Sequence, residues 1–174
     1  MEEETIWVTA IDSNSNADLL MLDGDLGVLD SVGLGMVEGS RVPVTASAGR
    51  LCVVLGPNYV ENLSTSYEVL QYSIQADLLA ATTQLVEASD YWALSGVLAV
   101  DDGCYVSEYF GGTDSVTALV SYLGGSGSVI DVIEMADTTV ADFFVDGKEV
   151  YQIGMTGELN GSTTAVSLAK HRRY

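Results

Sequence analysis

The residues with the clearest potential for chemistry lie near the start of the chain, where oxygen-bearing side chains follow one another closely. These ligand candidates are Asp12, Asn14, Asn16, Asp18 and Asp23. An EF-hand loop binds Ca²⁺ through oxygen atoms of alternate residues and a carboxylate at the twelfth position. However, Ala17 stands where that loop needs glycine, and Asp23 replaces the bidentate glutamate. The sequence therefore favours a polar turn between strands, with a surface calcium or sodium site as the alternative.

The catalytic groups of common hydrolases are missing from the sequence. A serine or cysteine nucleophile usually needs a positioned histidine base, and the single histidine, His171, lies four positions from the chain end among basic residues. No Gly-x-Ser-x-Gly, phosphate-binding loop or zinc-type Cys/His cluster occurs. Paired carboxylates of the glycosidase type stay open as an alternative, although Trp7 and Trp92 fall in strand patterns. We expect a protein that is not an enzyme and takes no cofactor.

Basic residues are concentrated at the end of the chain. Lys170, Arg172 and Arg173 are three of its six cations. We expect residues 170–174 to form a basic tail after a single β domain of residues 1–169. One interpretation is a solvated end. The other is a contact with a neighbouring subunit's carboxylates, an anionic membrane or packaged DNA.

The rest of the chain is strongly acidic because it lacks cations. The formal net charge is −19, yet only 18% of the residues are charged and 48% are hydrophobic. The acidic groups of such a surface repel one another in dilute salt. The screening length is about 10 Å at 0.1 M salt and much shorter at 1 M, so concentrated salt weakens this repulsion. An acidic mesophilic protein is one interpretation, and a protein that works in molar salt is the favoured one. The body has no basic patch, so we expect no sequence-specific binding of nucleic acid.

Other local features say little about the cellular setting. Cys52 and Cys104 are the only cysteines, and both a disulfide and two separate core residues remain open. The acidic N-terminus does not resemble a signal peptide, and no apolar run reaches 18 residues. Asn62 and Asn160 begin glycosylation sequons, for which chance is the simpler explanation.

Short apolar runs separated by Gly, Asn and Asp predict many β-strands. Alternation from Leu70 to Leu78 indicates a half-buried strand, while 76–88 also fits a helix. The weakly patterned segment 26–39 predicts a surface loop. The other predicted strands are 5–11, 17–22, 41–46, 51–55, 91–100, 105–110, 116–123, 129–135, 139–145, 149–153 and 163–168.

These runs predict an all-β fold with at most one or two short helices. The expected architecture is an antiparallel sandwich, jelly-roll-like, or a barrel. Asp146-Gly147 is the best hairpin signal. We find no repeat of fixed period in the sequence.

Acidic composition and strand density together resemble virion proteins of haloarchaeal viruses, in particular small single jelly-roll capsid proteins. The resemblance implies a non-enzymatic subunit made in the host cytoplasm that assembles in the virion with copies of itself and other virion proteins. The basic tail would then face an internal membrane or packaged DNA. Two alternatives are a tail-tube or head-decoration protein of a tailed haloarchaeal virus, and a secreted β-sandwich that binds carbohydrate or calcium.

Overall fold

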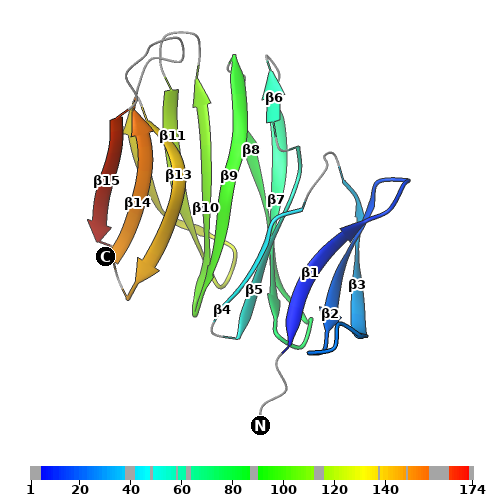
Figure 1. The fold of residues 1–174 in the computed structure, drawn as a ribbon. Helices are drawn as coiled ribbons and strands as arrows, with labels where there is room; N and C mark the ends of the chain where they lie inside the picture. The colour runs from blue at the N-terminus through cyan, green and yellow to red at the C-terminus, as the bar shows by residue number, and fades with distance from the viewer. Residues whose placement is uncertain are drawn as a thin grey trace.

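The computed structural model describes residues 5–37, 42–47, 49–57, 59–61, 64–86, 90–111, 116–136, 138–147, 149–156 and 165–172. All regular structure in these ranges is β-strand, and no helix there is long and apolar enough to cross a membrane. The strands form four antiparallel sheets that follow one another along the chain (Figure 1). The prediction of an all-β, antiparallel fold is therefore confirmed.

The two end sheets have three strands each. The first sheet has the order β1 (Ile6–Ile11), β2 (Asn16–Leu22), β3 (Val28–Met36). The fourth sheet has the order β13 (Thr138–Asp146), β14 (Glu149–Thr156), β15 (Ala165–Arg172). The two lie at opposite ends of the row of sheets.

The two middle sheets are larger. The second sheet has the order β4 (Val44–Ser47), β5 (Arg50–Leu55), β7 (Thr65–Ser73), β8 (Leu78–Val86). The third has the order β12 (Val129–Ala136), β11 (Val116–Gly124), β10 (Gly103–Gly111), β9 (Tyr91–Val100), β6 (Tyr59–Glu61). Apart from the short β6, hydrogen-bonded neighbours are consecutive in sequence. This meander connectivity differs from the crossed order of a jelly roll and is the unit of β-propeller blades.

One turn recurs between strands that are far apart in the sequence. Asp12–Asn16, Asp23–Gly27, Ser73–Asp77 and Gly124–Ser128 each close a hairpin by a backbone hydrogen bond from the first residue to the fifth residue's carbonyl. Their fourth residues have left-handed backbone, with φ of 65° at Ser15, 65° at Leu26, 66° at Ala76 and 83° at Gly127.

The last three of these turns are each the final turn of their sheet, and they start 50 and 51 residues apart. The final turns of the first three sheets are therefore regularly spaced, although these sheets have three, four and five strands and the sequence shows no repeat of fixed period. The turn sequences differ because backbone hydrogen bonds define this turn, and several residue types can adopt its conformation.

The hydrophobic core is divided into three layers, one between each pair of successive sheets. Leu19 and Leu51 centre the layer between the first and second sheets. Val69 and Trp92 lie in the layer between the second and third sheets, and Tyr105 and Phe143 in the next. Each fully buried large side chain contributes about 2 kcal/mol of hydrophobic free energy. The sheets are thus held together mainly by their faces.

Polar contacts also join successive sheets. The Thr9 hydroxyl donates to the Val42 carbonyl at 2.7 Å. The Thr82 hydroxyl donates to the carbonyl of Gly127 at 2.6 Å, and the Thr45 hydroxyl accepts from the Ala99 amide at 2.7 Å. The latter two bonds fix the second sheet against a turn and a strand of the third.

The row of sheets is fanned. Contacts between sheets join β1 to β4, β4 to β9 and β9 to β13, which line one side of the row. Among the described residues, β3, β8 and β12 on the other side show no comparable contact with one another. Successive sheets are therefore in closer contact near these strands, although β13 also meets β10 and β11, and the bond from Thr82 to Gly127 joins the sheets near β8 and β12.

Two local predictions were wrong or incomplete. Segment 26–39, predicted as a loop, contains strand β3. Its glycines weakened the pattern, and Gly35, with a φ of 86°, lies next to a bulge in the pairing with β2. Segment 78–86, for which a helix was the alternative prediction, is strand β8, and its exposed and half-buried residues alternate.

Cys52 and Cys104 form a disulfide between the second and third sheets, with a Cα–Cα distance of 6.0 Å. Both residues are fully buried and lie in the core layer with Trp92. Of the two interpretations open from the sequence, the disulfide is the one observed. It adds a covalent link between two sheets that also meet through side-chain packing and hydrogen bonds.

We predict that the double variant Cys52→Ala/Cys104→Ala lowers the free energy of unfolding by about 4 kcal/mol, since the disulfide closes a loop of 52 residues in the unfolded chain. Urea denaturation of the variant and of the oxidised protein measures the difference. An unchanged unfolding midpoint would contradict a role of this bond in joining the sheets.

Candidate functional site

The predicted metal ligands begin in the hairpin turn between β1 and β2. Asp12 Oδ1 accepts hydrogen bonds from the amides of Asn14 at 2.8 Å and Asn16 at 2.9 Å. Its Oδ2 accepts from the Asn16 side chain at 3.0 Å. These bonds, that of the Asn16 side chain above all, hold the pKa of the Asp12 carboxyl below its usual range. The carboxylate therefore closes the turn.

The remaining predicted ligands lie elsewhere. Asp18 is exposed on β2, and Asp23 begins the turn at the other end of that strand. Seven strand residues separate the two turns by roughly 20 Å, which is too far for one cation to contact both carboxylates. In the ranges that the structure describes, no group of three or more His, Cys, Asp or Glu side chains has the geometry of a metal site. The structure therefore keeps Asp12, Asn14 and Asn16 in one turn and separates them from Asp23.

A buried carboxyl group on β10 is the most unusual titratable group in the described chain. Glu108 is 8% exposed, and its Oε2 accepts a hydrogen bond from the Trp92 indole at 2.7 Å. Burial raises the pKa of the Glu108 carboxyl, while the bonds from Trp92 and Tyr67 oppose that rise. Tyr67 stacks on Trp92 with ring centroids 5.5 Å apart. This cluster joins the second and third sheets, and Tyr67 also borders the groove described below.

The sequence contains a pattern that indicates this cluster. Val106, Glu108 and Phe110 alternate along one predicted strand, so a glutamate stands on the face that apolar neighbours occupy. A charged residue at such a position needs a buried partner. The partner itself, Trp92, follows only from the pairing of β9 with β10.

We predict that Glu108→Gln makes the protein more stable than wild type at pH 7, with an advantage that shrinks towards pH 4. The pKa of the Glu108 carboxyl is higher in the folded protein than in the unfolded chain. The folded wild-type protein therefore loses stability as the pH rises from the unfolded-state pKa through the raised folded-state pKa. Glutamine keeps an acceptor for Trp92 without the charge. Thermal denaturation across this pH range measures the effect, and an advantage that is equal at all pH values would contradict it.

Two fully buried glutamines differ in how their amides are satisfied. Gln71 accepts from the Arg50 guanidinium at 2.6 Å and donates to the Gly124 carbonyl at 2.9 Å, which ties the second sheet to a turn of the third. Both polar atoms of the Gln152 side chain, which is buried to the same extent, have no hydrogen-bond partner in the described structure. Burial of an amide without partners destabilises a fold.

We therefore predict opposite effects for one substitution at these two positions. Gln152→Met should raise the free energy of unfolding by about 1 kcal/mol, whereas Gln71→Met should lower it by about 2 kcal/mol. Chemical denaturation of both variants provides the test. Destabilisation by Gln152→Met would show that this amide makes bonds that the structure lacks.

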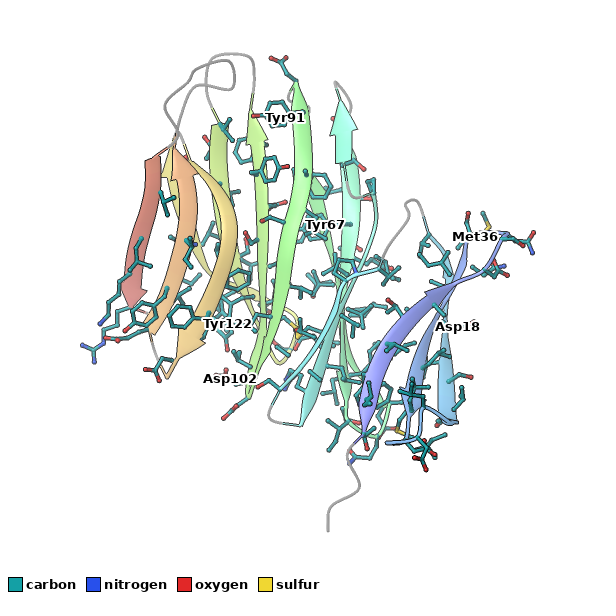
Figure 2. The ribbon with its side chains drawn as sticks, in the orientation of Figure 1. Asp18, Met36, Tyr67, Tyr91, Asp102 and Tyr122 are labelled. Atoms are coloured by element: carbon teal, nitrogen blue, oxygen red, sulfur yellow. A yellow bond between two sulfur atoms is a disulfide. The ribbon has the colours of Figure 1, made fainter. Side chains whose placement is uncertain are left out.

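A groove of about 430 Å³ opens between the first two sheets, where β3 ends and β7 begins. Its lining includes Leu34, Met36, Thr65 and Ser66, and Glu68 is its ionisable carboxylate. Figure 2 shows Met36 at the outer end of β3 and Tyr67 further into the molecule. No cluster of charged groups converges on the groove, so it lacks the polar anchors of a specific ligand site.

The basic end of the chain belongs to the fourth sheet up to Arg172. Lys170 and Arg172 lie in β15, so they are strand residues rather than a tail, while Arg173 and Tyr174 lie outside the described residues. The Lys170 ammonium contacts the Glu149 carboxylate at 2.7 Å and lies 5.3 Å from the Tyr151 ring centroid. The hydrogen bond between these groups lowers the pKa of Glu149 and raises that of Lys170. Lys170 is therefore engaged within its own chain.

The outward side of the fourth sheet carries both apolar and charged side chains. Val150 and Gln152 on β14 are buried against the third sheet, so their alternate neighbours point away from it. The fourth-sheet outer face includes Phe144, Asp146, Glu149, Tyr151, Ile153, Val166, Leu168, Lys170 and Arg172. Leu168 is 70% exposed and Val166 76%. The Phe144 and Tyr151 rings stack at 4.7 Å, which gives this face a flat aromatic surface.

The first sheet has a corresponding outward side. Ala17 and Leu19 are buried against the second sheet, so the residues between and beside them point outwards. The first-sheet outer face includes Ile6, Val8, Ala10, Asp18, Leu20, Val28, Ser31 and Gly33. Leu22, which pairs with Ile6 and Val28, is itself buried. Val28 is 62% exposed and Ile6 36%. Both ends of the row of sheets therefore present apolar side chains.

Comparisons with known proteins give no assignment. No family model matches the chain, and no curated protein matches it. A solved structure of an apocarotenoid oxygenase mutant (Trp149Ala) from Synechocystis is similar at 11% sequence identity, with a TM-score of 0.48. The match covers 98% of this chain and 48% of the oxygenase, so the chain spans about half that protein's length. This likeness carries no information about activity.

Proposed function

We propose that this chain is a non-enzymatic structural subunit that assembles with other subunits in concentrated salt. The observation that carries the proposal is the exposure of apolar side chains on both end sheets. Within the row, the facing sides of successive sheets cover each other. Strands β8 and β12 of the middle sheets also expose apolar side chains, including Leu85 and Ile130. Exposed contiguous apolar surface on a soluble protein commonly marks an interaction site.

The charge of the chain determines the conditions under which such faces can meet. Two copies, each with a formal net charge of −19, repel each other in dilute buffer. In molar salt the screening length falls to about 3 Å, so short-range apolar contacts dominate. Concentrated salt is therefore the condition under which this surface composition allows assembly.

A virion of a haloarchaeal virus is the setting that we propose for such a subunit. The acidic composition supports it, and the disulfide is consistent with a particle that persists outside the reducing cytoplasm. Meander sheets with exposed ends suit stacked or ring-shaped assemblies, so a tail-tube or decoration role has more support than a jelly-roll shell. The secreted calcium-binding alternative has less, since its proposed ligands lie apart.

Sedimentation velocity of the purified chain at 0.1 M and 3 M KCl tests the proposal. We predict a monomer in dilute salt and discrete assemblies in concentrated salt, because screening removes the repulsion between acidic copies. Far-ultraviolet circular dichroism at both salt concentrations controls for folding. A folded monomer at 3 M KCl, at protein concentrations up to about 100 μM, would argue against a self-assembling subunit, since weaker association than this lies below the usual range of specific interfaces.

A further inference from the structure

We infer that the second and third sheets protect the Cys52–Cys104 disulfide from reductants, so that the bond is broken only when these two sheets separate. The folded protein then keeps its disulfide in a reducing compartment, whereas an unfolded chain loses it. This inference concerns the single chain and does not depend on the proposed assembly. Burial of the cysteines, the position of their strands and the neighbouring hydrogen bonds each support it.

The two cysteines are closed off from solvent. Cys52 and Cys104 each have an exposed fraction of 0%. Their core layer includes Val54 and Val69 from the second sheet and Val106 from the third. A reductant thiolate must reach one of the two sulfur atoms directly, because the exchange proceeds through a mixed disulfide. Close packing of the layer blocks this approach in the folded protein.

Each cysteine lies on an inner strand of its sheet. Cys52 is on β5, which pairs with β4 on one side and with β7 on the other. Cys104 is on β10, which lies between β9 and β11. Fraying of an edge strand therefore leaves both cysteines covered by their own sheets, and exposure of the bond needs a larger opening.

Hydrogen bonds join the same two sheets on both sides of the disulfide. Cys52 pairs with Thr45 on β4 and with Gln71 on β7, so these three residues form one row across the second sheet. The Thr45 hydroxyl accepts from the Ala99 amide of the third sheet at 2.7 Å. The Gln71 side chain donates to the Gly124 carbonyl of the third sheet at 2.9 Å. The row thus crosses the boundary at three neighbouring positions.

The third sheet has the matching row. Cys104 pairs with Ala99 on β9 and with Leu123 on β11, and Gly124 follows Leu123 in the chain. The disulfide therefore lies between two hydrogen bonds that join the same two sheets. We name these three links the intersheet row: Thr45–Ala99, Cys52–Cys104 and Gln71–Gly124. An opening that exposes the sulfur atoms must break its hydrogen bonds as well as separate packed side chains.

Reduction would also release a charged group into this layer. A dithiol reductant attacks one sulfur atom as a thiolate, the S–S bond breaks, and the other cysteine leaves as a thiolate that takes up a proton. The second thiol of the reductant then resolves the mixed disulfide. Two electrons pass to the protein, and the reductant becomes a cyclic disulfide. Cys52 Sγ lies 3.6 Å from the Gly103 carbonyl oxygen, whose partial negative charge disfavours a thiolate at Cys52.

Reduction of a dilute sample by excess dithiothreitol in 3 M KCl tests the inference. Alkylation under denaturing conditions followed by mass spectrometry measures the fraction reduced. We expect the folded wild-type chain to be reduced at least about 100-fold more slowly than the same chain unfolded in guanidinium chloride, because only the open state reacts. Reduction of the folded chain at the rate of the unfolded chain would overturn the inference.

Two matched threonine variants identify the opening that exposes the bond. Thr45→Val removes a hydroxyl from the intersheet row and leaves the Ala99 amide without its acceptor. Thr9→Val is the control, since it removes a hydroxyl that joins the first and second sheets through Val42. We expect Thr45→Val to speed reduction of the folded chain by about tenfold and Thr9→Val to leave the rate unchanged. Circular dichroism verifies that both variants fold.

A second variant of the intersheet row lies on the other side of the disulfide. Gln71→Met removes the bond to Gly124 and should speed reduction in the same way, so the test stands if Thr45→Val does not fold. Equal acceleration by Thr9→Val would show that the bond reacts only after complete unfolding, and would overturn control by this boundary. No acceleration by either row variant would show that the reductant reaches the bond by another route. Self-assembly is tested separately by sedimentation.

Discussion

The structure depends on one constraint, which is that a sheet with apolar residues on both faces must be covered on both faces. β10 shows the constraint most clearly, because Gly103 to Glu108 are all buried. Such a strand is stable only between two other sheets, and the row of sheets meets this need for the second and third sheets. The same row leaves the outward sides of the first and fourth sheets exposed, and the proposed assembly follows from those two faces.

Specific contacts then fix the sheets that hydrophobic packing brings together. The Cys52–Cys104 disulfide joins the second and third sheets at the centre of a core layer. Gln71 adds a buried polar bond across the same boundary, to Gly124, while Glu108 binds Trp92 within the third sheet. Packing of this kind is rigid, so the spacing between neighbouring sheets is set by the interior. An external face that repeats this packing can therefore accept another sheet without rearrangement.

The sequence predicted most strands and the all-β class because alternation and turn residues reflect local physics. The sequence did not reveal the regular spacing of the turns that begin at Asp23, Ser73 and Gly124. These turns have the same backbone hydrogen bond, but their amino-acid sequences differ. Glycines hid β3 as well. The polar turn favoured for Asp12 to Asn16 is present, whereas the spacing in sequence did not show that strand β2 separates Asp12 from Asp23. The basic residues were noticed, but their place in a strand depends on pairing with β14.

Amide hydrogen exchange of the wild-type chain in 3 M KCl, followed by mass spectrometry at two protein concentrations, tests the central claim most directly. If copies cover each other's end sheets, exchange in β1–β3 and in β13–β15 slows as the concentration rises, while β9 and β10 stay equally protected. Exchange in the end sheets that does not depend on concentration, or new protection confined to β8 and β12, would contradict the claim.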